Sequence, residues 1–418
     1  MSEIKQGYKQ TKVGIIPEDW EIVKLGKLTT VETGKTPLRS NKQFWDNGTI
    51  NWATTTEVNE TYIVSTNEKI TNQAVAELKM KILPINTILL AMYGQGKTRG
   101  KVALLRIEST INQAFASIKP NKNYSTNFIF NYLDKSYEKI RDLSHGSNQD
   151  NLNLDIVKAL QIPLPPLKEQ EKIAEILTTW DEAITKQEEL LEAKELLKIA
   201  LMQKLLSGEV RFGGFTDEWE EVRLGEIGEF KTSSIDKIIN ENESLVNLIN
   251  YMDVYRNKHI DKNFRCSKTS LKEEQYEKVN LKKGDILFTP SSETPDDIGH
   301  SAVIIEDLPN TVYSYHLVRF RPKKSIDLKF SGYVFNNIDI LKEFAKRANG
   351  STRFTLSIKD FNETKAKLPS LLEQHKIAEV LSLVDDEINL LKNELEELKL
   401  QKKALMQKLL TGEVRVKV

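Results

Sequence analysis

A long internal repeat organises this chain. The stretch Ala200–Arg211 reads Ala-Leu-Met-Gln-Lys-Leu-Leu-Ser-Gly-Glu-Val-Arg, and it returns as Ala404–Arg415 with one change, threonine for serine. Upstream, Glu169–Glu175 corresponds to Glu373–Glu379 at the same offset of 204 residues. A repeat of this length indicates tandem duplication of a whole structural unit, so we expect two similar halves.

Each copy of the repeat predicts one long helix. Lys168–Leu206 and Leu372–Leu410 contain no glycine or proline. Prolines precede the two stretches and glycines follow them, as expected at helix starts and ends (Pro165, Pro166 and Pro369; Gly208 and Gly412). At 1.5 Å per residue, each helix would be about 60 Å long.

Apolar residues in the second copy recur at alternating spacings of four and three, which predicts a coiled-coil seam. Lys402 alone interrupts this seam. The first copy is less regular, because it places Gln187, Lys194 and Lys198 where apolar residues are expected. Two separate helices buried in different domains are the alternative. We favour two helices packed on each other, because typical globular helices are much shorter.

Composition limits the cellular and chemical context. The chain of 418 residues is long enough for two or three domains, and its one cysteine, Cys266, excludes a disulfide framework. No secretory leader or membrane-length apolar run is present, so we expect a cytoplasmic protein. The net charge is zero, but the two helices carry −3 and −2, which leaves +5 for the remainder. This distribution permits a local basic face for nucleic acid.

Each half begins with a strand-like segment in which tryptophan and aliphatic residues alternate with charged ones, at Ile16–Gly26 and Phe215–Gly225. The first Gly-Glu-Val-Arg is followed within a few residues by such a segment, and the second copy stands at the C-terminus. By analogy, we expect the N-terminal segment to lie beside the chain's own C-terminal end. The interiors of the halves are mixed. Strands are predicted at Ile85–Met92, Lys101–Ile107, Asp285–Thr289 and Ala302–Ile305, and single helices at Phe128–Leu143 and Tyr333–Ala348.

A glycine-rich basic loop, Tyr93–Lys101, is the first candidate site. It fails the P-loop pattern in its spacing and in the residue after its last lysine, so a nucleotide site is disfavoured. We interpret it as a hairpin that meets a nucleic-acid backbone or groove, with a plain surface turn as the alternative. Its candidate DNA contacts, by the chemistry of phosphates and base edges, are Gln95, Lys97, Arg99 and Lys101.

Two amide-rich turns at equivalent positions are the second candidate. His145–Asn151 leads into the first long helix and Ala348–Phe354 into the second. Their side chains could read base edges, or the turns could merely end a helix as Asx turns (Asn148 and Gln149; Asn349 and Arg353). The five histidines show no metal-ligand spacing, so no metal site is predicted, and no catalytic motif was found.

The duplicated motifs together resemble the specificity subunit, HsdS, of type I restriction–modification systems. The resemblance is carried by the Pro-x-Leu-x-Glu-Gln-x-Lys-Ile-Ala-Glu helix starts at Pro165 and Pro369, by the Leu-Met-Gln-Lys-Leu-Leu-[Ser/Thr]-Gly-Glu-Val-Arg helix ends, and by the Pro-Glu-Asp-Trp-Glu segment at Pro17. It covers the whole chain. Its base-reading residues lie in variable parts and follow no motif.

The resemblance implies an α+β fold with two mixed α/β target recognition domains in internal repeat, joined by two long antiparallel coiled-coil helices. The domains would be residues 1–165 and 213–367, and the helical spacers 166–212 and 368–418. Each domain would read one half of a bipartite double-stranded DNA site, and the helices would set the spacing between the half-sites.

The resemblance also implies partners. Two methyltransferase subunits that use S-adenosylmethionine would dock on the duplicated regions, and motor-nuclease subunits that use ATP would complete the complex; the chain itself would carry no cofactor and no catalytic site. Near-identical helix ends suggest two copies of one partner, with candidate contacts at Met202, Lys204, Leu205, Met406, Lys408 and Leu409. The alternatives are an enzyme with a cryptic site and a coiled-coil adaptor. The missing catalytic motifs oppose the former, and the divergent halves oppose the latter.

Overall fold

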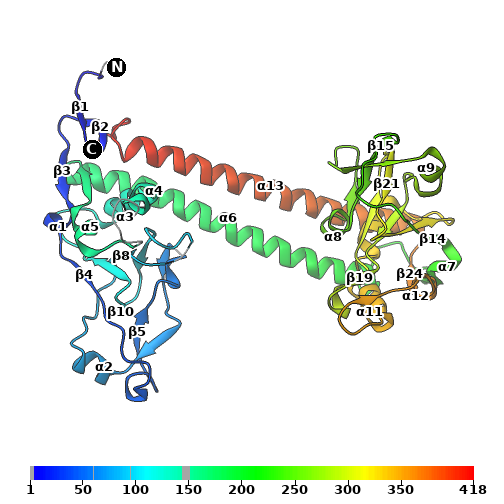
Figure 1. The fold of residues 1–418 in the computed structure, drawn as a ribbon, viewed down its shortest axis with the longest axis horizontal. Coiled ribbons are helices and arrows are strands. Elements are labelled where there is room, and N and C mark those ends of the chain that lie inside the picture. Colours follow the sequence, from blue (N-terminus) through cyan, green and yellow to red (C-terminus); the bar gives the residue numbers. More distant parts are fainter. Residues whose placement is uncertain (1–3, 60, 95, 144–150) are drawn as a thin grey trace. The chain divides into compact units, whose positions relative to one another are not determined.

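The computed structural model describes residues 4–59, 61–94, 96–143 and 151–418. The chain forms two compact units, which are labelled by element in Figure 1. Unit 1 consists of residues 1–188 and 394–418, and unit 2 consists of residues 189–393. Both long helices contribute residues to both units.

Unit 1 is built on a five-stranded sheet of order β4-β11-β8-β9-β6. Its strands are antiparallel except for the parallel pair β6 and β9. The three central strands are buried at every position, and their alternate residues face two different cores: Ile88 and Leu90 lie in one cluster, Leu89 and Ala91 in another. The strands are β4 (Val31–Thr33), β11 (Phe115–Ile118), β8 (Ile88–Ala91), β9 (Val102–Leu105) and β6 (Tyr62–Ile63).

Smaller elements surround this sheet. A second sheet has the order β10-β5-β7, and two strand pairs, β1 with β2 and β3 with β12, complete the unit. These strands are β10 (Thr110–Ile111), β5 (Ile50–Ala53), β7 (Glu68–Ile70), β1 (Tyr8–Thr11), β2 (Gly14–Pro17), β3 (Glu21–Lys24) and β12 (Gln161–Leu164). The helices are α1 (Leu25–Leu28), η1 (Lys42–Phe44), η2 (Glu57–Asn59), α2 (Asn72–Glu77), α3 (Thr126–Lys135), α4 (Tyr137–Asp142) and α5 (Leu154–Ala159).

Unit 2 repeats this plan. Its main sheet has the order β14-β22-β18-β20-β16, and its second sheet the order β17-β15-β21. The strands of the two sheets are β14 (Gly228–Thr232), β22 (Val318–Pro322), β18 (Ile286–Phe288), β20 (Ser301–Ile304), β16 (His259–Ile260), β17 (Ser267–Leu271), β15 (Ser244–Ile249) and β21 (Thr311–Tyr313).

Two strand pairs and six helices complete unit 2, together with one 3-10 turn. The pairs are β13 (Glu220–Arg223) with β24 (Lys365–Leu368), and β19 (Ser291–Ser292) with β23 (Phe354–Thr355). The helices are α7 (Leu224–Ile227), α8 (Tyr251–Arg256), α9 (Glu273–Val279), η3 (Pro295–Asp297), α10 (Leu328–Val334), α11 (Ile338–Arg347) and α12 (Ile358–Glu363).

The strand order confirms the internal repeat predicted from the sequence. Position by position, the five-stranded sheets correspond, and in both units the outermost pair is parallel, β6 with β9 and β16 with β20. The second sheets also match, because β10 pairs parallel with β5 as β21 does with β15. The predicted α+β class with two mixed domains in internal repeat is therefore correct.

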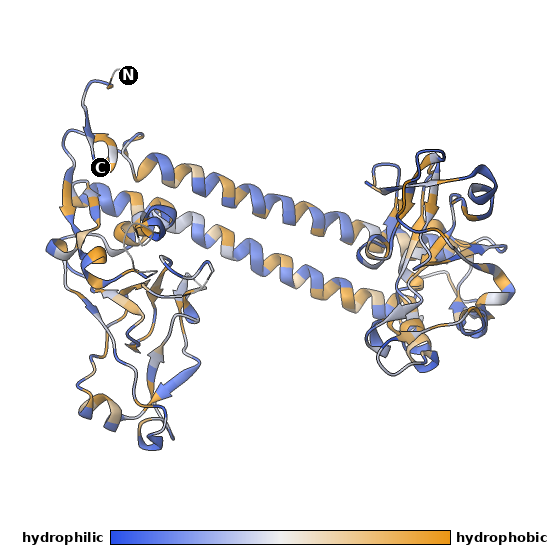
Figure 2. Ribbon diagram, in the orientation of Figure 1, coloured by the Kyte–Doolittle hydropathy of each residue, from blue (hydrophilic) through white to orange (hydrophobic). Residues whose placement is uncertain are grey.

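The long helices begin and end within one residue of the sequence prediction. Helix α6 spans Leu167–Ser207 and α13 spans Leu371–Leu409. Helix α6 stops directly before Gly208, and α13 stops three residues before Gly412; both glycines lie in the left-handed region, with φ 76° and 72°, where a side chain would be strained. Figure 2 shows hydrophilic and hydrophobic residues interleaved along both helices. In the part of the chain that the structure describes, no helix is long and apolar enough to cross a membrane.

The helices pair antiparallel within each unit, and the polar residues that interrupt the predicted seam are the ones matched across it. In unit 2, Lys194 binds Glu387 at 2.7 Å, and Lys198 pairs with Asp385. In unit 1, Lys402 pairs with Asp181, which is the repeat counterpart of the second of these bridges. The irregular seam is therefore charge-complementary, which fixes the register of the two helices.

A second set of ion pairs distinguishes the two copies. In unit 1, Glu188 binds Lys399 at 2.9 Å, and in unit 2, Glu195 binds Lys392 at 2.8 Å. The first copy of the repeat has glutamate at both of its positions, and the second copy has lysine at both. Two first copies placed together would therefore oppose like charges, whereas a first and a second copy attract.

One expectation about the short helices was wrong. The single helix predicted at Phe128–Leu143 is two helices, α3 and α4, because Ser136 leaves the helical region and its N–H bonds back to α3. The helix predicted at Tyr333–Ala348 also divides, into α10 and α11. Each pair buries one apolar face in the same core, so the periodicity continues across the break.

Candidate nucleic-acid interface

The glycine-rich loop of unit 1 connects β8 to β9, two neighbouring inner strands of the main sheet. Lys97 is exposed, and Arg99 and Lys101 are half-buried. The loop is held against α4, because the Tyr137 hydroxyl donates to the Lys97 carbonyl at 2.7 Å. This arrangement presents cationic side chains on a braced loop, which suits contact with phosphates or guanine. Gln95 lies outside the described residues.

Of the second candidate stretch of unit 1, only Asn151 lies within the described residues. The backbone N–H of Leu152 donates to the carbonyl of Met92 at 3.1 Å, so the segment before α5 lies beside the start of the loop. Asn148 and Gln149 lie outside the described residues, and their candidate role stays a prediction.

In unit 2, the equivalent loop and turn are joined directly by a short strand pair. The β18–β20 loop pairs with the turn before α12 through β19 and β23, with Ser291 opposite Thr355. Arg353 is exposed, and its Nη2 donates to Ser291 Oγ at 3.2 Å. Asn349 is used locally instead, because its side-chain amide donates to the Arg347 carbonyl at 2.9 Å. Arg353 is therefore better placed than Asn349 to meet a ligand.

The loops at these equivalent places carry opposite charges. The unit 1 loop contributes Lys97, Arg99 and Lys101, and the unit 2 loop contributes Glu293, Asp296 and Asp297. In the acidic loop, Asp297 accepts from His300 Nε2 at 2.9 Å and from the Tyr255 hydroxyl at 3.1 Å. The bond to Asp297 raises the pKa of Tyr255, because ionisation would place two negative charges together. Equivalent scaffolds thus present different recognition chemistry.

Sequence reasoning missed an aromatic cluster in unit 1. The Arg39 guanidinium lies 4.0 Å from the Trp45 ring centroid and 5.1 Å from that of Trp52, and it forms a bidentate ion pair with Glu68. The hydrogen bonds from Arg39 lower the pKa of the Glu68 carboxyl. No local motif announces this cluster, because the four residues come from separate elements of the second sheet and its flanking turns.

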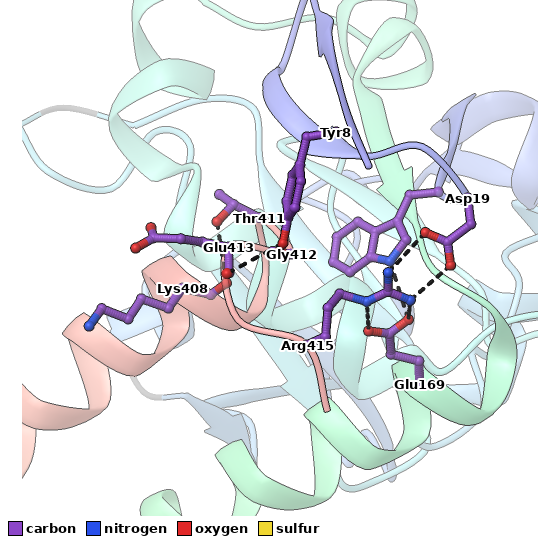
Figure 3. A network of polar contacts seen from close by, with 9 residues as sticks. Tyr8, Asp19, Glu169, Lys408, Thr411, Gly412, Glu413 and Arg415 are labelled. Atoms are coloured by element: carbon purple, nitrogen blue, oxygen red, sulfur yellow. Dashed lines mark hydrogen bonds and ion pairs between the residues drawn. The ribbon is translucent and has the colours of Figure 1, made fainter. Parts of the chain in front are cut away.

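An ion pair to the buried Glu169 fixes the segment after α13 to the start of α6 in unit 1 (Figure 3). Arg415 donates to both oxygens of Glu169 at 2.6 and 2.8 Å and to Asp19 at 2.8 and 2.9 Å. The indole N–H of Trp20 also donates to Glu169, at 3.2 Å. These bonds raise the pKa of the guanidinium and lower that of Asp19. The Tyr8 hydroxyl donates to the Gly412 carbonyl at 2.8 Å, so the predicted closure of the N-terminal segment on the C-terminal end is confirmed.

Unit 2 repeats the arginine, glutamate and tryptophan of this network. Arg211 donates to Glu373 at 2.7 and 2.8 Å, and the indole N–H of Trp219 donates to the same carboxylate at 3.2 Å. The Gly-Glu-Val-Arg motif and the tryptophan segment are therefore a structural latch on the first turn of the partner helix. Their repetition in the sequence is explained by packing within each unit.

This packing alters the candidate partner contacts at the helix ends. Leu205, Leu409 and Met406 are buried in the cores of their own units, so they offer no surface to another protein. Met202 is half-buried, whereas Lys204 and Lys408 are exposed. The sequence assigned the three buried residues to a partner because their repetition looked like a shared docking surface. Of the six candidates, Lys204, Lys408 and the exposed part of Met202 are accessible to a partner protein.

The described residues contain no group of three or more histidine, cysteine, aspartate or glutamate side chains arranged to hold a metal ion. Two of the described histidines have hydrogen-bond partners in the protein: His300 binds Asp297, and His259 Nε2 lies 3.0 Å from the Lys329 carbonyl. The site thus consists of polar loops at the strand ends of the two main sheets, in equivalent places and with different side chains.

Comparison with known families decides what this repeated architecture is. A family model for the type I restriction modification DNA specificity domain matches residues 17–194 and again residues 216–400. The chain belongs to this family. The two matches coincide with the two halves of the repeat, so each unit holds one specificity domain.

Proteins that carry the name of type I specificity subunits match the chain over nearly its whole length. The specificity subunit of the type I restriction enzyme MjaIX from Methanocaldococcus jannaschii is 28% identical over 98% of this chain and 96% of its own length. The S subunit of a type I restriction-modification system from M. genitalium shares the fold, with a TM-score of 0.53, 19% identity and coverage of 93% and 96%. A chain solved in a study of type I complex assembly has a TM-score of 0.63, with 18% identity and coverage of 96% and 99%.

Proposed function

We propose that the chain is the DNA specificity subunit of a type I restriction–modification complex, in which each unit reads one part of a bipartite target. The strongest support is that the two units share one strand order but carry dissimilar loops at the equivalent strand ends, β8–β9 and β18–β20. Two domains that share a scaffold and differ in their loops can recognise two different DNA sequences. Family membership supports the same function.

The chemistry of the loops supports direct contact with DNA. The basic loop of unit 1 offers cations for phosphates and guanine, and the loop and turn of unit 2 offer hydroxyl, carboxylate and guanidinium groups for base edges. We propose that the long helices set the distance between the two reading units. At 1.5 Å per residue, a helix of 41 residues spans about 60 Å, which corresponds to roughly 18 base pairs.

The chain is proposed to act without chemistry of its own. Methyl transfer from S-adenosylmethionine would belong to methyltransferase subunits, and ATP-driven cleavage to motor-nuclease subunits. The absence of catalytic motifs in the sequence supports this division of labour. A gel-shift titration with the methyltransferase partner added tests it: sequence-selective binding that requires both proteins is expected. Binding of the partner without DNA selectivity would instead indicate an adaptor.

The exposed lysines at the helix ends are proposed to contribute to partner docking. Lys204 and Lys408 occupy equivalent positions of the repeat, so each would meet one copy of the same methyltransferase. Charge reversal at either lysine should weaken binding of one of two copies, measured by native mass spectrometry. Charge reversal at Lys186, which is exposed near the middle of α6, is the control. Unchanged binding of both copies by both variants would reject these contacts.

A further inference from the structure

Unit 2 contains a cleft between its β18–β20 loop and helix α8. The cavity has a volume of about 570 Å³. Three parts of the chain that are distant in sequence form its walls: α8, the β18–β20 loop and the turn before α12, with His316 between them. Its lining is polar and aromatic: Tyr251, Met252, Tyr255, Ser291, Ser292, Glu293, Thr294, Asp297, His316, Thr352 and Arg353.

The walls of this cleft are braced by hydrogen bonds and ring contacts. The Tyr251 hydroxyl donates to the Ser291 carbonyl at 2.9 Å, which ties α8 to the loop. Tyr251 and Tyr255 stack with ring centroids 6.0 Å apart, and Tyr255 contacts His300 edge to face at 4.9 Å. A braced cleft holds its remaining polar groups in fixed directions, which is a requirement for reading one base pair over another.

Two charged side chains in the lining remain available for a ligand. Arg353 is exposed and uses one of its nitrogens on Ser291, so most of its five N–H donors are open to a partner. Glu293 is also exposed. By contrast, the Asp297 carboxylate already accepts from Tyr255 and His300. The cleft therefore offers one strong donor and one strong acceptor.

This combination excludes a phosphate as the main ligand, because carboxylates on the loop would repel it. It fits a base pair in the major groove instead. Arginine donates to guanine O6 and N7, and a carboxylate accepts from the N4 amine of cytosine. These two bases form one pair and lie on opposite strands. We propose that this cleft of unit 2 reads a guanine–cytosine pair, with Arg353 on the guanine and Glu293 on the cytosine.

The proposal rests on the proposed function of the chain and adds the base pair and the residues that select it. It also predicts that the two halves of the target differ in character, because the equivalent loop of unit 1 is basic and has no such acidic rim. Both side chains act on the same base pair, so their loss should relax the same position of the target.

The test compares the methylated sites of cells that carry the methyltransferase with wild-type chain, Arg353→Ala or Glu293→Ala. Each variant is expected to keep the part of the motif read by unit 1. Each should lose roughly 5- to 100-fold of its discrimination at one shared guanine–cytosine position in the other part. Arg256→Ala is the matched control, because Arg256 is an exposed arginine on α8 outside the cavity lining; it should leave the motif unchanged.

The outcomes separate the two claims. If the wild-type chain directs no bipartite methylation, the proposed function itself fails. If the wild-type chain does so but both variants keep an unchanged motif, or relax different positions, the cleft proposal is overturned while the function stands. If Arg353→Ala abolishes methylation although the protein melts at the wild-type temperature, the Glu293→Ala motif decides between the proposal and its rejection.

Discussion

Removing Arg415 should destabilise unit 1, because the buried Glu169 carboxylate would lose its ion-pair partner. The Glu169 side chain is only 2% exposed and accepts two hydrogen bonds from Arg415 and one from Trp20. In Arg415→Ala, the Glu169 carboxylate would keep only the hydrogen bond from the Trp20 indole. Leaving a buried charge unpaired costs about 3–5 kcal/mol when water cannot reach it.

The expected loss is smaller than that upper range. The Arg415 side chain is 40% exposed, so water can occupy part of the space that it leaves and solvate the carboxylate. We therefore expect the free energy of unfolding of unit 1 to fall by about 2 kcal/mol. Glu169→Gln in the Arg415→Ala background should recover part of this loss, because a neutral amide is less costly to bury than an unpaired carboxylate.

Guanidinium unfolding of the full chain measures the loss, and hydrogen exchange at the first turns of α6 assigns it to unit 1. Arg211→Ala is the matched variant, because it breaks the equivalent latch and should loosen the first turns of α13 instead. An Arg415→Ala protein that unfolds within 0.5 kcal/mol of wild type would refute the reasoning. So would a loss of the same size in the Glu169→Gln background, since the two residues would then be uncoupled.

Three further outcomes are expected. Glu188→Lys should destabilise the helix pair by roughly 0.5 kcal/mol in chemical denaturation, and adding Lys399→Glu should restore it; no rescue would show that the exposed ion pair contributes nothing. Burial, and secondarily Lys198, lowers the pKa of Lys258 from 10.5 to about 8. Between these two pH values the unfolded chain binds a proton at Lys258 that the folded chain does not, which favours unfolding at the lower pH. Stability from this group should therefore rise as pH increases from about 8 to 10.5, and thermal melts of Lys258→Met should lack that rise. The purified chain should transfer no methyl group from S-adenosylmethionine; incorporation of label without a co-purified partner, checked by mass spectrometry, would contradict this.

The long helices were predictable because their signals are local and redundant. Prolines before the helix, a glycine after it and a long stretch free of glycine and proline agree at both copies, so the boundaries at Leu167 and Leu409 were found to within one residue. The break at Ser136 was not predictable from the same signals. Helices α3 and α4 bury one common face, and the apolar spacing alone cannot reveal that the backbone turns between them.

The candidate site was predictable only in part, since its residues come together through long-range contacts. The sequence marked Arg353 as a candidate contact, without a reason to join it to the β18–β20 loop. Two strands of two residues each, β19 and β23, bring them together, and a two-residue strand leaves no periodic pattern. The repeated leucines failed as partner contacts for the opposite reason: their repetition reflects a shared core, with Leu205 at 3% and Leu409 at 2% exposure.

The most direct test of two reading units separated by a helical ruler is a chain lengthened by one heptad in each long helix, after Leu191 and Leu395. A heptad keeps the seam in phase and adds about 10 Å, which corresponds to roughly three base pairs. Sequencing of the methylated sites should show both half-sequences unchanged and the unread spacer wider by about three base pairs. A folded, active variant with an unchanged spacer, or with altered half-sequences, would contradict the account.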